Sequence, residues 1–464
     1  MSEQHSHQQN AATEGVTDVT AAQAHLPSDC DVVELREGWL LVSPGHAVFC
    51  SLSPVEWEAV QQVLSGASAL ESLGETVLGR LTRHGFFAAP REPEDDPPTV
   101  QLQLTNDCNL DCSYCCTNSG EPRAREVGFD ELSGLVEQLD EAFDGPIRVA
   151  ILGGEPLLVP WATELGHRVL SNGHELTLFT NGLPLCDDAV AARVAELVHA
   201  GAEVRVSLGG PNQQSCDELS RAERFDRVLQ GLERLASHGA GAALDLMLMP
   251  QNAAAVAKDW QGLRRQLPEG TPVTLGVLYR AGREVGEHLF PTADGLEEAL
   301  NDIAFGAGER VAKAERKPVT HRREGCGCAL GNHLHVRSDG ALFTCFKMEE
   351  RVGHLGDADF VQAVHRMRQT PHPTRALDLC RDCALRTLCG GGCRAENYLY
   401  TGDADTPICG DWRVQVVAEL LADEQVDAVD WPAHHLHKEA LRRGIDAPAE
   451  LSPIRQSSHL LDTD

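Results

Sequence analysis

Three features are missing from this chain of 464 residues, and each absence excludes a class of protein. No apolar run approaches the roughly 20 residues that a membrane-spanning helix needs. The N-terminal stretch "MSEQHSHQQNAATEG" lacks the basic-then-apolar order of a signal peptide. Basic residues are scarce, since 39 Lys and Arg stand against 70 Asp and Glu, for a formal net charge of −31. We therefore expect a cytoplasmic protein that binds neither nucleic acid nor an anionic membrane.

Cysteine, in contrast, is abundant, with 16 residues in the chain. Eleven of them fall into two clusters, at 108–116 and 326–393, and one more follows at Cys409. Because the cytoplasm keeps disulfides reduced, such clusters indicate metal or redox chemistry. The remaining four are isolated, and we interpret them as ordinary small apolar residues: Cys30, Cys50, Cys186 and Cys216.

The first 98 residues divide into a tail, a small module and a linker. Residues 1–28 show no hydrophobic period and are expected to be disordered. The module, residues 29–92, opens with alternating strands around an "SPGH" hairpin turn. A helix then begins at "SPVEWEAVQQVLSG", with a Ser N-cap and Pro at the first helical position, and a second helix follows. This order predicts a winged-helix-like α+β module, followed by a proline- and acid-rich linker at 93–98.

Six apolar strand candidates alternate with amphipathic helices in residues 99–310, which predicts a parallel sheet, either doubly wound or curled into a partial barrel. The strands begin near Thr99, Ile147, Glu175, Glu203, Ala243 and Pro272. After the first, they end in "GGEP", "TNG", "SLGG", "MPQN" and "YRAGR". Because the carboxyl ends of barrel strands form the active-site face, these polar ends are expected to converge on one pocket.

The first strand runs into Cys108, Cys112 and Cys115, spaced C-x3-C-x2-C. Three thiolates on one short loop can ligate a 4Fe–4S cluster and leave one iron open. A zinc site and buried thiols are the alternatives, but zinc sites usually pair two cysteine knuckles, and no second knuckle lies at normal spacing. Spacing alone therefore favours iron and sulfur only modestly. We interpret the adjacent Cys116 as a structural thiol.

This loop resembles that of the radical S-adenosylmethionine (radical SAM) enzymes, in which an aromatic residue, here Tyr114, precedes the third cysteine. Their second-strand motif of two glycines, Glu and Pro is matched by Gly153, Gly154 and Glu155 with the proline that follows. The resemblance implies a partial (β/α)6 TIM-like barrel that binds one 4Fe–4S cluster and S-adenosyl-L-methionine. It also implies reductive cleavage of that cofactor to a 5′-deoxyadenosyl radical. The strand edge or Glu155 would accept from the methionine ammonium.

Three further strand ends match positions that line the cofactor in this family: Asn181, Ser207 and Asn252. The fourth-strand motif departs from the family pattern. Gly209 stands where the family usually has Asp, and the arginine that meets the cofactor carboxylate is matched by Arg221, shifted by one place. We predict Arg221 as that contact, with a plain surface arginine as the alternative.

The second cluster resembles the SPASM extension of peptide- and protein-modifying radical SAM enzymes. We place this C-terminal cysteine-rich iron–sulfur domain at 311–415, followed by a helix and tail at 416–464. Its pattern implies two auxiliary 4Fe–4S clusters, although a pair of zinc ribbons is an alternative for part of it. One would be held by Cys328, Cys345 and Cys393 with Cys326 as candidate fourth ligand, and the other by Cys380, Cys383, Cys389 and Cys409. Because only one residue separates Cys326 from Cys328, an open iron in the first cluster is the alternative. His333 and His335 alternate onto one strand face and are expected to pack there.

The module at 29–92 resembles the RiPP recognition element, which takes up leader peptides by strand addition. Together these resemblances imply a radical SAM peptide maturase that cross-links or otherwise modifies a ribosomally made precursor. Its electrons would come from an external flavodoxin- or ferredoxin-type donor. The rivals are maturation of a quinohaemoprotein subunit, maturation of a sulfatase, and a non-catalytic zinc scaffold that binds peptides. Sulfatase maturation is disfavoured because Phe346 replaces the Asp that those enzymes place after the cysteine matching Cys345.

Overall fold

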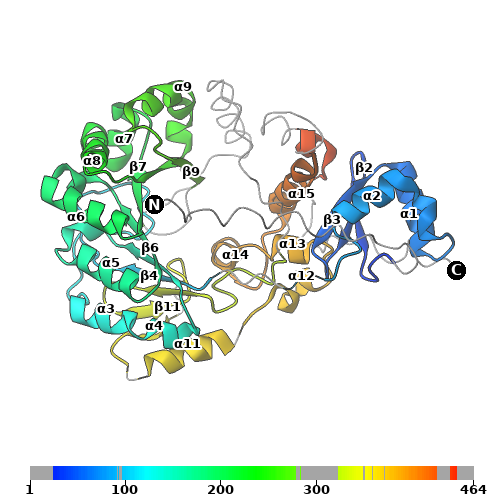
Figure 1. The fold of residues 1–464 in the computed structure, drawn as a ribbon, viewed down its shortest axis with the longest axis horizontal. Helices are drawn as coiled ribbons and strands as arrows, with labels where there is room; N and C mark the ends of the chain where they lie inside the picture. Colours follow the sequence, from blue (N-terminus) through cyan, green and yellow to red (C-terminus); the bar gives the residue numbers. More distant parts are fainter. Residues whose placement is uncertain are drawn as a thin grey trace, which may run out of the picture.

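The computed structural model describes residues 25–90, 92, 97–277, 283, 322–348, 351–357, 359–369, 371–425 and 439–446. Most of the predicted tail and linker, the boundary near residue 310 and the final segment lie outside these residues. Within the described ranges, no helix is both long and apolar enough to cross a bilayer. Figure 1 shows the barrel at one end of the molecule and the N-terminal module at the other, with helices α12 to α15 nearer the module.

The N-terminal module is a three-stranded antiparallel meander of β1 (Asp31–Leu35), β2 (Gly38–Ser43) and β3 (Val48–Leu52). Helix α1 (Pro54–Leu64) begins as the sequence predicts, because Ser53 and Glu56 form a reciprocal capping box and proline occupies the first turn. Helix α2 (Gly74–Arg83) completes the module. Both helices pack on one sheet face around Trp57, Val60, Val77 and Leu81.

The six predicted core strands are present in one sheet, parallel and in chain order, and each begins within one residue of its predicted start. They are β4 (Thr99–Gln103), β5 (Arg148–Leu152), β6 (Glu175–Thr180), β7 (Glu203–Leu208), β8 (Ala243–Leu248) and β9 (Val273–Val277). The helices between them are α3 (Phe129–Val136), α4 (Leu139–Phe143), α5 (Ala162–Ser171), α6 (Asp188–His199), α7 (Gln213–Ser220), α8 (Phe225–Ser237) and α9 (Pro250–Gln266). A continuous apolar core of Leu, Val and Ile side chains joins strands and helices.

The C-terminal region adds three strands to this same sheet. The sequence places His333 and His335 on a strand but does not predict that this region joins the core sheet. Strand β10 (His333–Val336) pairs in parallel with β4, and β11 (Ala341–Phe343) and β12 (Arg351–His354) follow antiparallel. The new strands satisfy the backbone groups that the edge of β4 would otherwise leave unpaired. The cysteine-rich region is therefore attached to the barrel at the strand that carries the first cysteine loop.

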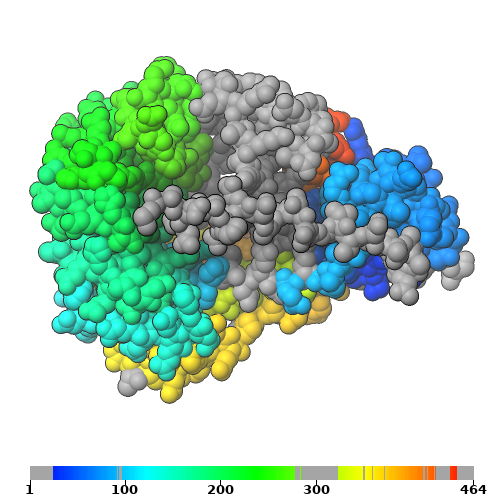
Figure 2. All heavy atoms as spheres, viewed as in Figure 1, coloured from blue at the N-terminus to red at the C-terminus, as the bar shows by residue number. Residues whose placement is uncertain are grey.

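The remaining helices are α11 (Phe360–Gln369), α12 (Asp378–Arg381), α13 (Arg386–Cys389), α14 (Arg394–Thr401) and α15 (Gly410–Gln425). Side chains of α13 and α15 pack on the second face of the module's sheet, where Val33, Leu40 and Phe49 meet Leu388, Val417, Leu420 and Leu421. The module, which forms the blue end of Figure 2, is thus anchored through an apolar interface to the cysteine-rich region.

Candidate functional site

The carboxyl end of β4 runs directly into the cysteine loop, residues 104–120. The loop closes on itself, because Cys108 N donates to Gly120 O at 2.8 Å and Gly120 N donates to Asn106 O at 2.9 Å. Within the loop, Ser119 N donates to Cys115 Sγ at 3.3 Å. These bonds hold the three spaced cysteines at a carboxyl strand end, on the face where the polar strand ends were expected to meet.

Burial and neighbouring thiols shift the ionisation of Cys108 and Cys112. Burial raises the pKa of Cys108 to about 11, and negative charge on Cys112 and Cys115 adds to the rise. Burial also raises the pKa of Cys112. The thiolate form is the one that ligates metal, and it is disfavoured here unless positive charge lies among the sulfurs. The donor set therefore fits an iron–sulfur cluster held by three cysteines.

Arg283, six residues after β9 ends, is hydrogen-bonded to the cysteine loop. Its backbone N donates to Cys115 O at 2.9 Å, and its Nη1 donates to Cys112 O at 3.1 Å. The guanidinium also contacts Asn118 Oδ1, Ser119 O and the Asp111 carboxylate. The sequence pointed to this strand end through "YRAGR" without singling out Arg283, because its partners lie about 170 positions earlier in the chain.

The two glycines of "GGEP" let the end of β5 approach the cysteine loop. A Cβ on Gly154 would lie 2.1 Å from Asp107 O, and one on Gly153 would lie 2.9 Å from Thr105 O. Gly154 N donates to Thr105 O at 2.8 Å in this close contact. Glycine lets a backbone approach a neighbouring group closely, because it has no Cβ. The structure shows that close approach of the two backbones already requires them.

Replacing Gly154 by Ala is expected to destabilise the protein by roughly 1–3 kcal/mol, because the backbone of Asp107 must move to admit a methyl group. The matched control is Gly134→Ala in α3, where an added Cβ meets nothing within 4 Å. Thermal unfolding and iron content after reconstitution measure the effect. Equal melting temperature and iron content in the Gly154→Ala and wild-type proteins would show that the contact does not position the loop.

Glu155 is fully buried and binds protein groups. Its carboxylate accepts from Thr180 Oγ1 at 2.7 Å, from Asn181 N at 2.7 Å and from Leu157 N at 3.0 Å. Burial raises its pKa, against the effect of these hydrogen bonds. Glu155 therefore ties the end of β5 to the end of β6. The sequence indicates two acceptors for the methionine ammonium, the strand edge and Glu155. Of these, Glu155 is already hydrogen-bonded to groups of the protein.

Two predicted asparagines also support the strand ends. Asn181 Nδ2 donates to Asn109 Oδ1 at 2.7 Å and lies 4.0 Å from Cys108 Sγ, so it contacts the cysteine loop. Asn252 is fully buried, and its Nδ2 donates to Gly209 O at 2.8 Å. Asn181 therefore lies at the candidate cluster, whereas Asn252 fixes the backbone of the neighbouring strand end.

Arg224 is a functional candidate that the sequence argument missed. Its side chain is only 1% exposed, it donates to Ser207 O, and its Nε has no hydrogen-bond partner among the described residues. The predicted Arg221 instead lies at the exposed end of α7 and pairs with Asp111 at 3.0 Å. A buried guanidinium with a spare donor is the better-placed partner for a carboxylate.

One sequence signal could have identified Arg224. It is the N-cap residue of α8, where the helix dipole disfavours a positive charge and where Ser, Thr, Asp or Asn is usual. Four neighbouring side chains raise the pKa of Arg224, against the effect of its burial: Tyr114, Cys216, Cys112 and Glu155. An arginine at this place therefore needs an anion, and the site surrounds it with anionic or polarisable groups.

The departure at Gly209 has a steric explanation. A Cβ at this position would lie 3.1 Å from Tyr114 Oη and 3.4 Å from Ser220 Oγ. The aspartate that the family usually carries there would have to displace the tyrosine of the cysteine loop. Tyr114 thus packs against the end of β7, which links the loop to the fourth core strand.

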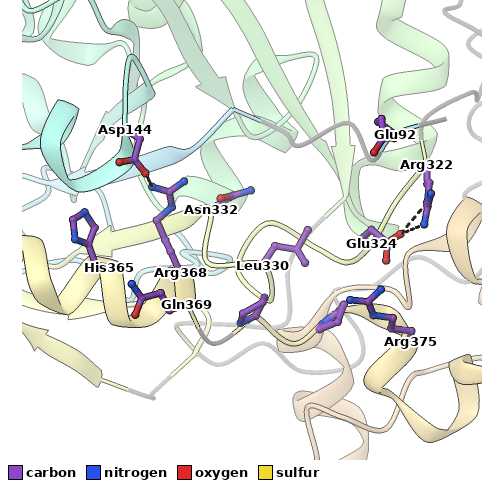
Figure 3. Close-up of a pocket in the computed structure, with 12 residues that line it drawn as sticks. Glu92, Asp144, Arg322, Glu324, Leu330, Asn332, His365, Arg368, Gln369 and Arg375 are labelled. Carbon is purple, nitrogen blue, oxygen red and sulfur yellow. Dashed lines mark hydrogen bonds and ion pairs between the residues drawn. The ribbon is translucent and has the colours of Figure 1, made fainter.

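The polar pocket in Figure 3 lies at the opposite end of the strands. Among its lining residues, Asn332 O accepts from Thr99 N at 2.8 Å, at the amino end of β4. Two ion pairs occupy its wall, Arg368 with Asp144 at 2.7 Å and Arg322 with Glu324 at 2.8 Å. We do not assign this pocket to the site, because barrel chemistry takes place at the carboxyl ends.

The C-terminal cysteines gather into two sets. In the first, Cys326 Sγ and Cys328 Sγ lie 3.2 Å apart, and a hydrogen bond from Cys328 lowers the pKa of both Cys326 and Cys345. Charge on Cys326 also reaches Cys393. Although only one residue separates Cys326 from Cys328 in the sequence, both thiols therefore lie in the same set.

The second set lines a small cavity and contains Cys380, Cys383, Cys389 and Cys409. Burial raises the pKa of Cys380 to about 12, and charge on the other three cysteines adds to the rise. The structure thus brings together the same two groups of four that the family pattern implies. Each offers the number of thiols that a fully ligated 4Fe–4S cluster takes.

A buried ion pair lies beside the first set. Lys347 Nζ contacts Glu396 Oε1 at 2.6 Å, and the lysine side chain is 6% exposed. Its positive charge lowers the pKa of Cys345 and opposes the rise that burial causes at Cys393 and at Cys116 of the first loop. Lys347 is therefore close to both cysteine regions.

The other histidines and cysteines singled out in the sequence have structural surroundings. His333 Nδ1 bonds Thr344 O at 2.9 Å, and His335 is buried, with its pKa lowered to about 3 by burial. Burial raises the pKa of Cys116 to about 11, as suits an inert thiol. Cys50 and Cys216 are also buried, which agrees with their interpretation as apolar residues.

The chain is similar to known proteins in sequence and in fold. Residues 102–258 match the radical SAM superfamily. The mycofactocin maturase MftC of Mycobacterium ulcerans is 27% identical over 335 residues, covering 68% of this chain and 88% of the relative. The PqqA peptide cyclase of Xanthomonas axonopodis pv. citri is 25% identical over 356 residues, covering 71% and 92%. The solved structure of native anSMEcpe with bound AdoMet has the same fold, with a TM-score of 0.54 at 16% identity, covering 74% and 99%.

Proposed function

We propose, on the premise that this chain is a radical SAM enzyme, that it modifies a ribosomally made precursor peptide. One observation carries the proposal: the chain aligns over about two thirds of its length with a mycofactocin maturase and a PqqA peptide cyclase. The non-catalytic zinc scaffold is set aside, because a radical SAM domain makes the chain an enzyme.

The residues at the carboxyl strand ends fit the cofactors that this family uses. Cys108, Cys112 and Cys115 would hold one 4Fe–4S cluster, which together with S-adenosyl-L-methionine supplies reductive radical generation. Arg224 has a buried donor free for the cofactor carboxylate, whereas Arg221 is exposed. Glu155 fixes the strand ends between which the cofactor would lie.

The protein's own contribution is positioning and exclusion of water. Arg283 holds the cysteine loop through the carbonyls of Cys112 and Ser119, so the loop presents its thiols in one arrangement. Tyr114 closes the loop against β7. A rigid, dry site directs a reactive radical to its substrate and away from solvent.

We further propose that the two C-terminal cysteine sets hold two auxiliary 4Fe–4S clusters. In the first set Cys328 is hydrogen-bonded to Cys326 and Cys345, and charge on Cys326 acts on Cys393. In the second set Cys383, Cys389 and Cys409 act on Cys380, and four thiols in each set fit complete ligation. Lys347 and Glu396 lie beside the first set, where a buried ammonium favours the more reduced, more negative form of a cluster. An external flavodoxin- or ferredoxin-type donor would supply electrons to the enzyme.

The module at 29–92 is proposed to hold the leader of the precursor. A three-stranded sheet with an outer edge strand suits strand addition by an extended peptide. Sulfatase maturation stays disfavoured, because Phe346 packs near His335, with ring centroids 6.2 Å apart, where an acidic side chain would be needed.

The test is anaerobic reconstitution of the full chain with iron and sulfide, followed by reaction with the precursor encoded beside the gene. We expect the peptide to change mass, by loss of two hydrogens for a cross-link, only when S-adenosyl-L-methionine and dithionite are both present. Tandem mass spectrometry locates the change. Formation of 5′-deoxyadenosine with an unchanged peptide would contradict a peptide substrate of this sequence.

A further inference from the structure

The outer edge of the module's sheet is already occupied by a side chain from the other end of the chain. Among the described residues, strand β3 pairs with β2 on one side and with no strand on the other. On the other side, Ser51 N donates to both carboxylate oxygens of Glu424 on α15, at 2.9 and 3.1 Å. Because alternate residues of a strand face the same edge, Phe49 presents its backbone there too. Glu424 thus takes the hydrogen bond that an added strand would need.

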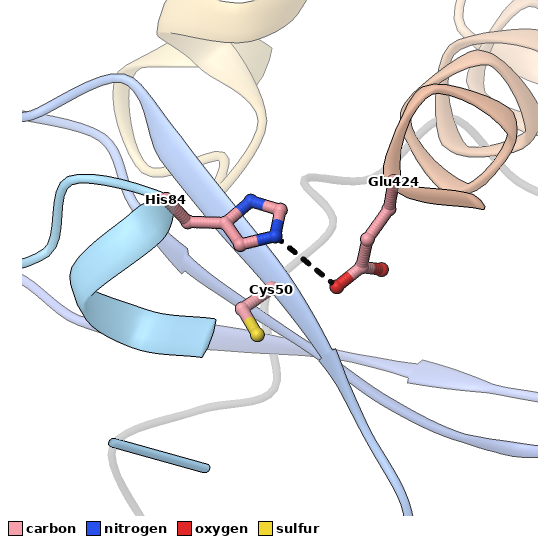
Figure 4. Close-up of side chains that lie close together, drawn as sticks. All are labelled: Cys50, His84 and Glu424. Atoms are coloured by element: carbon pink, nitrogen blue, oxygen red, sulfur yellow. Dashed lines mark ion pairs between the residues drawn. The ribbon is translucent and has the colours of Figure 1, made fainter. Parts of the chain in front are cut away.

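A histidine and an arginine lie beside this carboxylate. His84 Nε2, at the end of α2, lies 3.8 Å from Glu424 Oε1, whose side chain is only 9% exposed. Figure 4 shows the imidazole ring and the carboxylate meeting beside Cys50 of β3. The guanidinium of Arg80 pairs with Glu56 at 3.1 Å and also acts on Glu424 and Cys50, while its Nε has no hydrogen-bond partner in the described part of the chain.

We propose that the Glu424 side chain acts as a plug, which blocks the free edge of β3 until the leader peptide displaces it. The leader that displaces it is an extended segment with an acidic side chain. This rests on the proposed function. A backbone carbonyl of the added strand takes over Ser51 N–H. Once Glu424 swings out, His84 loses its carboxylate partner, and Arg80, which keeps its ion pair with Glu56, loses a second nearby negative charge. An Asp or Glu of the leader takes the place of Glu424 beside both.

Helix α15 itself stays in place during this exchange. Its apolar face packs on the module through Val417, Leu420 and Leu421, which are buried in the shared core. Only the Glu424 side chain needs to leave, and α15 then forms one wall of the groove that the peptide enters. The plug also keeps the edge from pairing with a second copy of the protein in the absence of substrate.

A metal ion is a weaker explanation of the same cluster. Cys50, His84 and Glu424 place their ligand atoms within 4.8 Å of one another. The guanidinium of Arg80 already supplies positive charge to this cluster, so a cation would be repelled. Burial, together with the charge of Glu424, also raises the pKa of the Cys50 thiol, which keeps it protonated.

The experiment measures binding of a fluorescein-labelled peptide, the leader of the precursor encoded beside the gene, to full-length enzyme by fluorescence anisotropy. We expect Glu424→Ala to bind at least about tenfold tighter than wild type, because the competing carboxylate is gone. Glu424→Gln keeps the shape and an acceptor for Ser51 N–H, so a smaller gain is expected. Glu419→Gln, an exposed position on the same helix, is the matched control.

Two further readouts separate the plug from a structural role. Amide hydrogen exchange at residues 48–52 is expected to speed up in free Glu424→Ala and to slow in every variant when leader is added. Changing the leader's acidic residues to amides is expected to weaken binding to wild type at least about tenfold. Circular dichroism and 5′-deoxyadenosine formation confirm that the variants are folded and reductively competent.

Unchanged affinity in Glu424→Ala, no protection at residues 48–52, or indifference to the acidic residues would each overturn the proposal. Stoichiometric zinc that disappears in Glu424→Ala would overturn it in favour of a metal site. Modification of the precursor without leader protection at β3 would leave the proposed function standing and end this inference alone.

Discussion

Replacing Cys108, Cys112 and Cys115 together by Ala is expected to reduce 5′-deoxyadenosine formation under dithionite to the level seen without enzyme. These three thiols lie on one loop at the carboxyl end of the first core strand, near Arg224 and Asn181. Without them nothing anchors a cluster with an open iron. The measurement is deoxyadenosine by liquid chromatography, with iron content falling by about four atoms per chain.

The control for this experiment is Cys116→Ala, next to the loop's third ligand. Its thiol is buried, so its loss is expected to cost stability while leaving the iron count and deoxyadenosine formation close to wild type. Wild-type cleavage of S-adenosyl-L-methionine by the triple variant would end the assignment of this loop. Loss of activity in Cys116→Ala at full iron content would show that a fourth loop cysteine takes part.

Replacing Cys380 and Cys383 together by Ala is expected to abolish the modified peptide while some uncoupled deoxyadenosine formation survives. The two residues lie in the second C-terminal set, and the first loop keeps its own anchors, including Arg283. Completing a cross-link requires removal of one further electron from the substrate, which is the chemistry an auxiliary cluster supplies. Product and deoxyadenosine are measured from the same reaction.

Folding must be monitored in this variant, because Cys383 and Cys389 pack against the apolar core between the N-terminal module and α15. Loss of metal there can cost folding free energy. Circular dichroism, gel filtration and leader binding therefore accompany the assay. A folded variant that lacks one cluster by iron count and still makes product at the wild-type rate would limit this set to a structural role.

The strand order and the cysteine loop could be predicted from sequence because their signals are local. Each core strand is a short apolar run flanked by an amphipathic helix, so starts such as Thr99 and Glu175 were found within a residue. The capping box at Ser53 and Glu56 spans only three positions. The C-x3-C-x2-C spacing likewise fixes three thiols on one loop without reference to the rest of the chain.

The contacts of the site could not be predicted in this way, because they join residues far apart in the chain. Glu155 meets Thr180 and Asn181 only because β5 and β6 are neighbours in the sheet. Arg221 matched a motif by position and proved exposed, whereas Arg224, three residues later, is buried. Which of two nearby arginines points inward depends on where α7 ends and α8 begins.

What the sequence determined by itself is the chemistry that the chain can hold: the number and spacing of the thiols, the alternating strands and helices, and the acidic balance. The tertiary structure alone decided which groups meet. It joined β10 to β4, sorted eight C-terminal cysteines into two sets, and brought Glu424 to Ser51 across 373 positions. Spacing is a property of covalent neighbours, whereas these contacts depend on how the burial of apolar faces brings distant segments together.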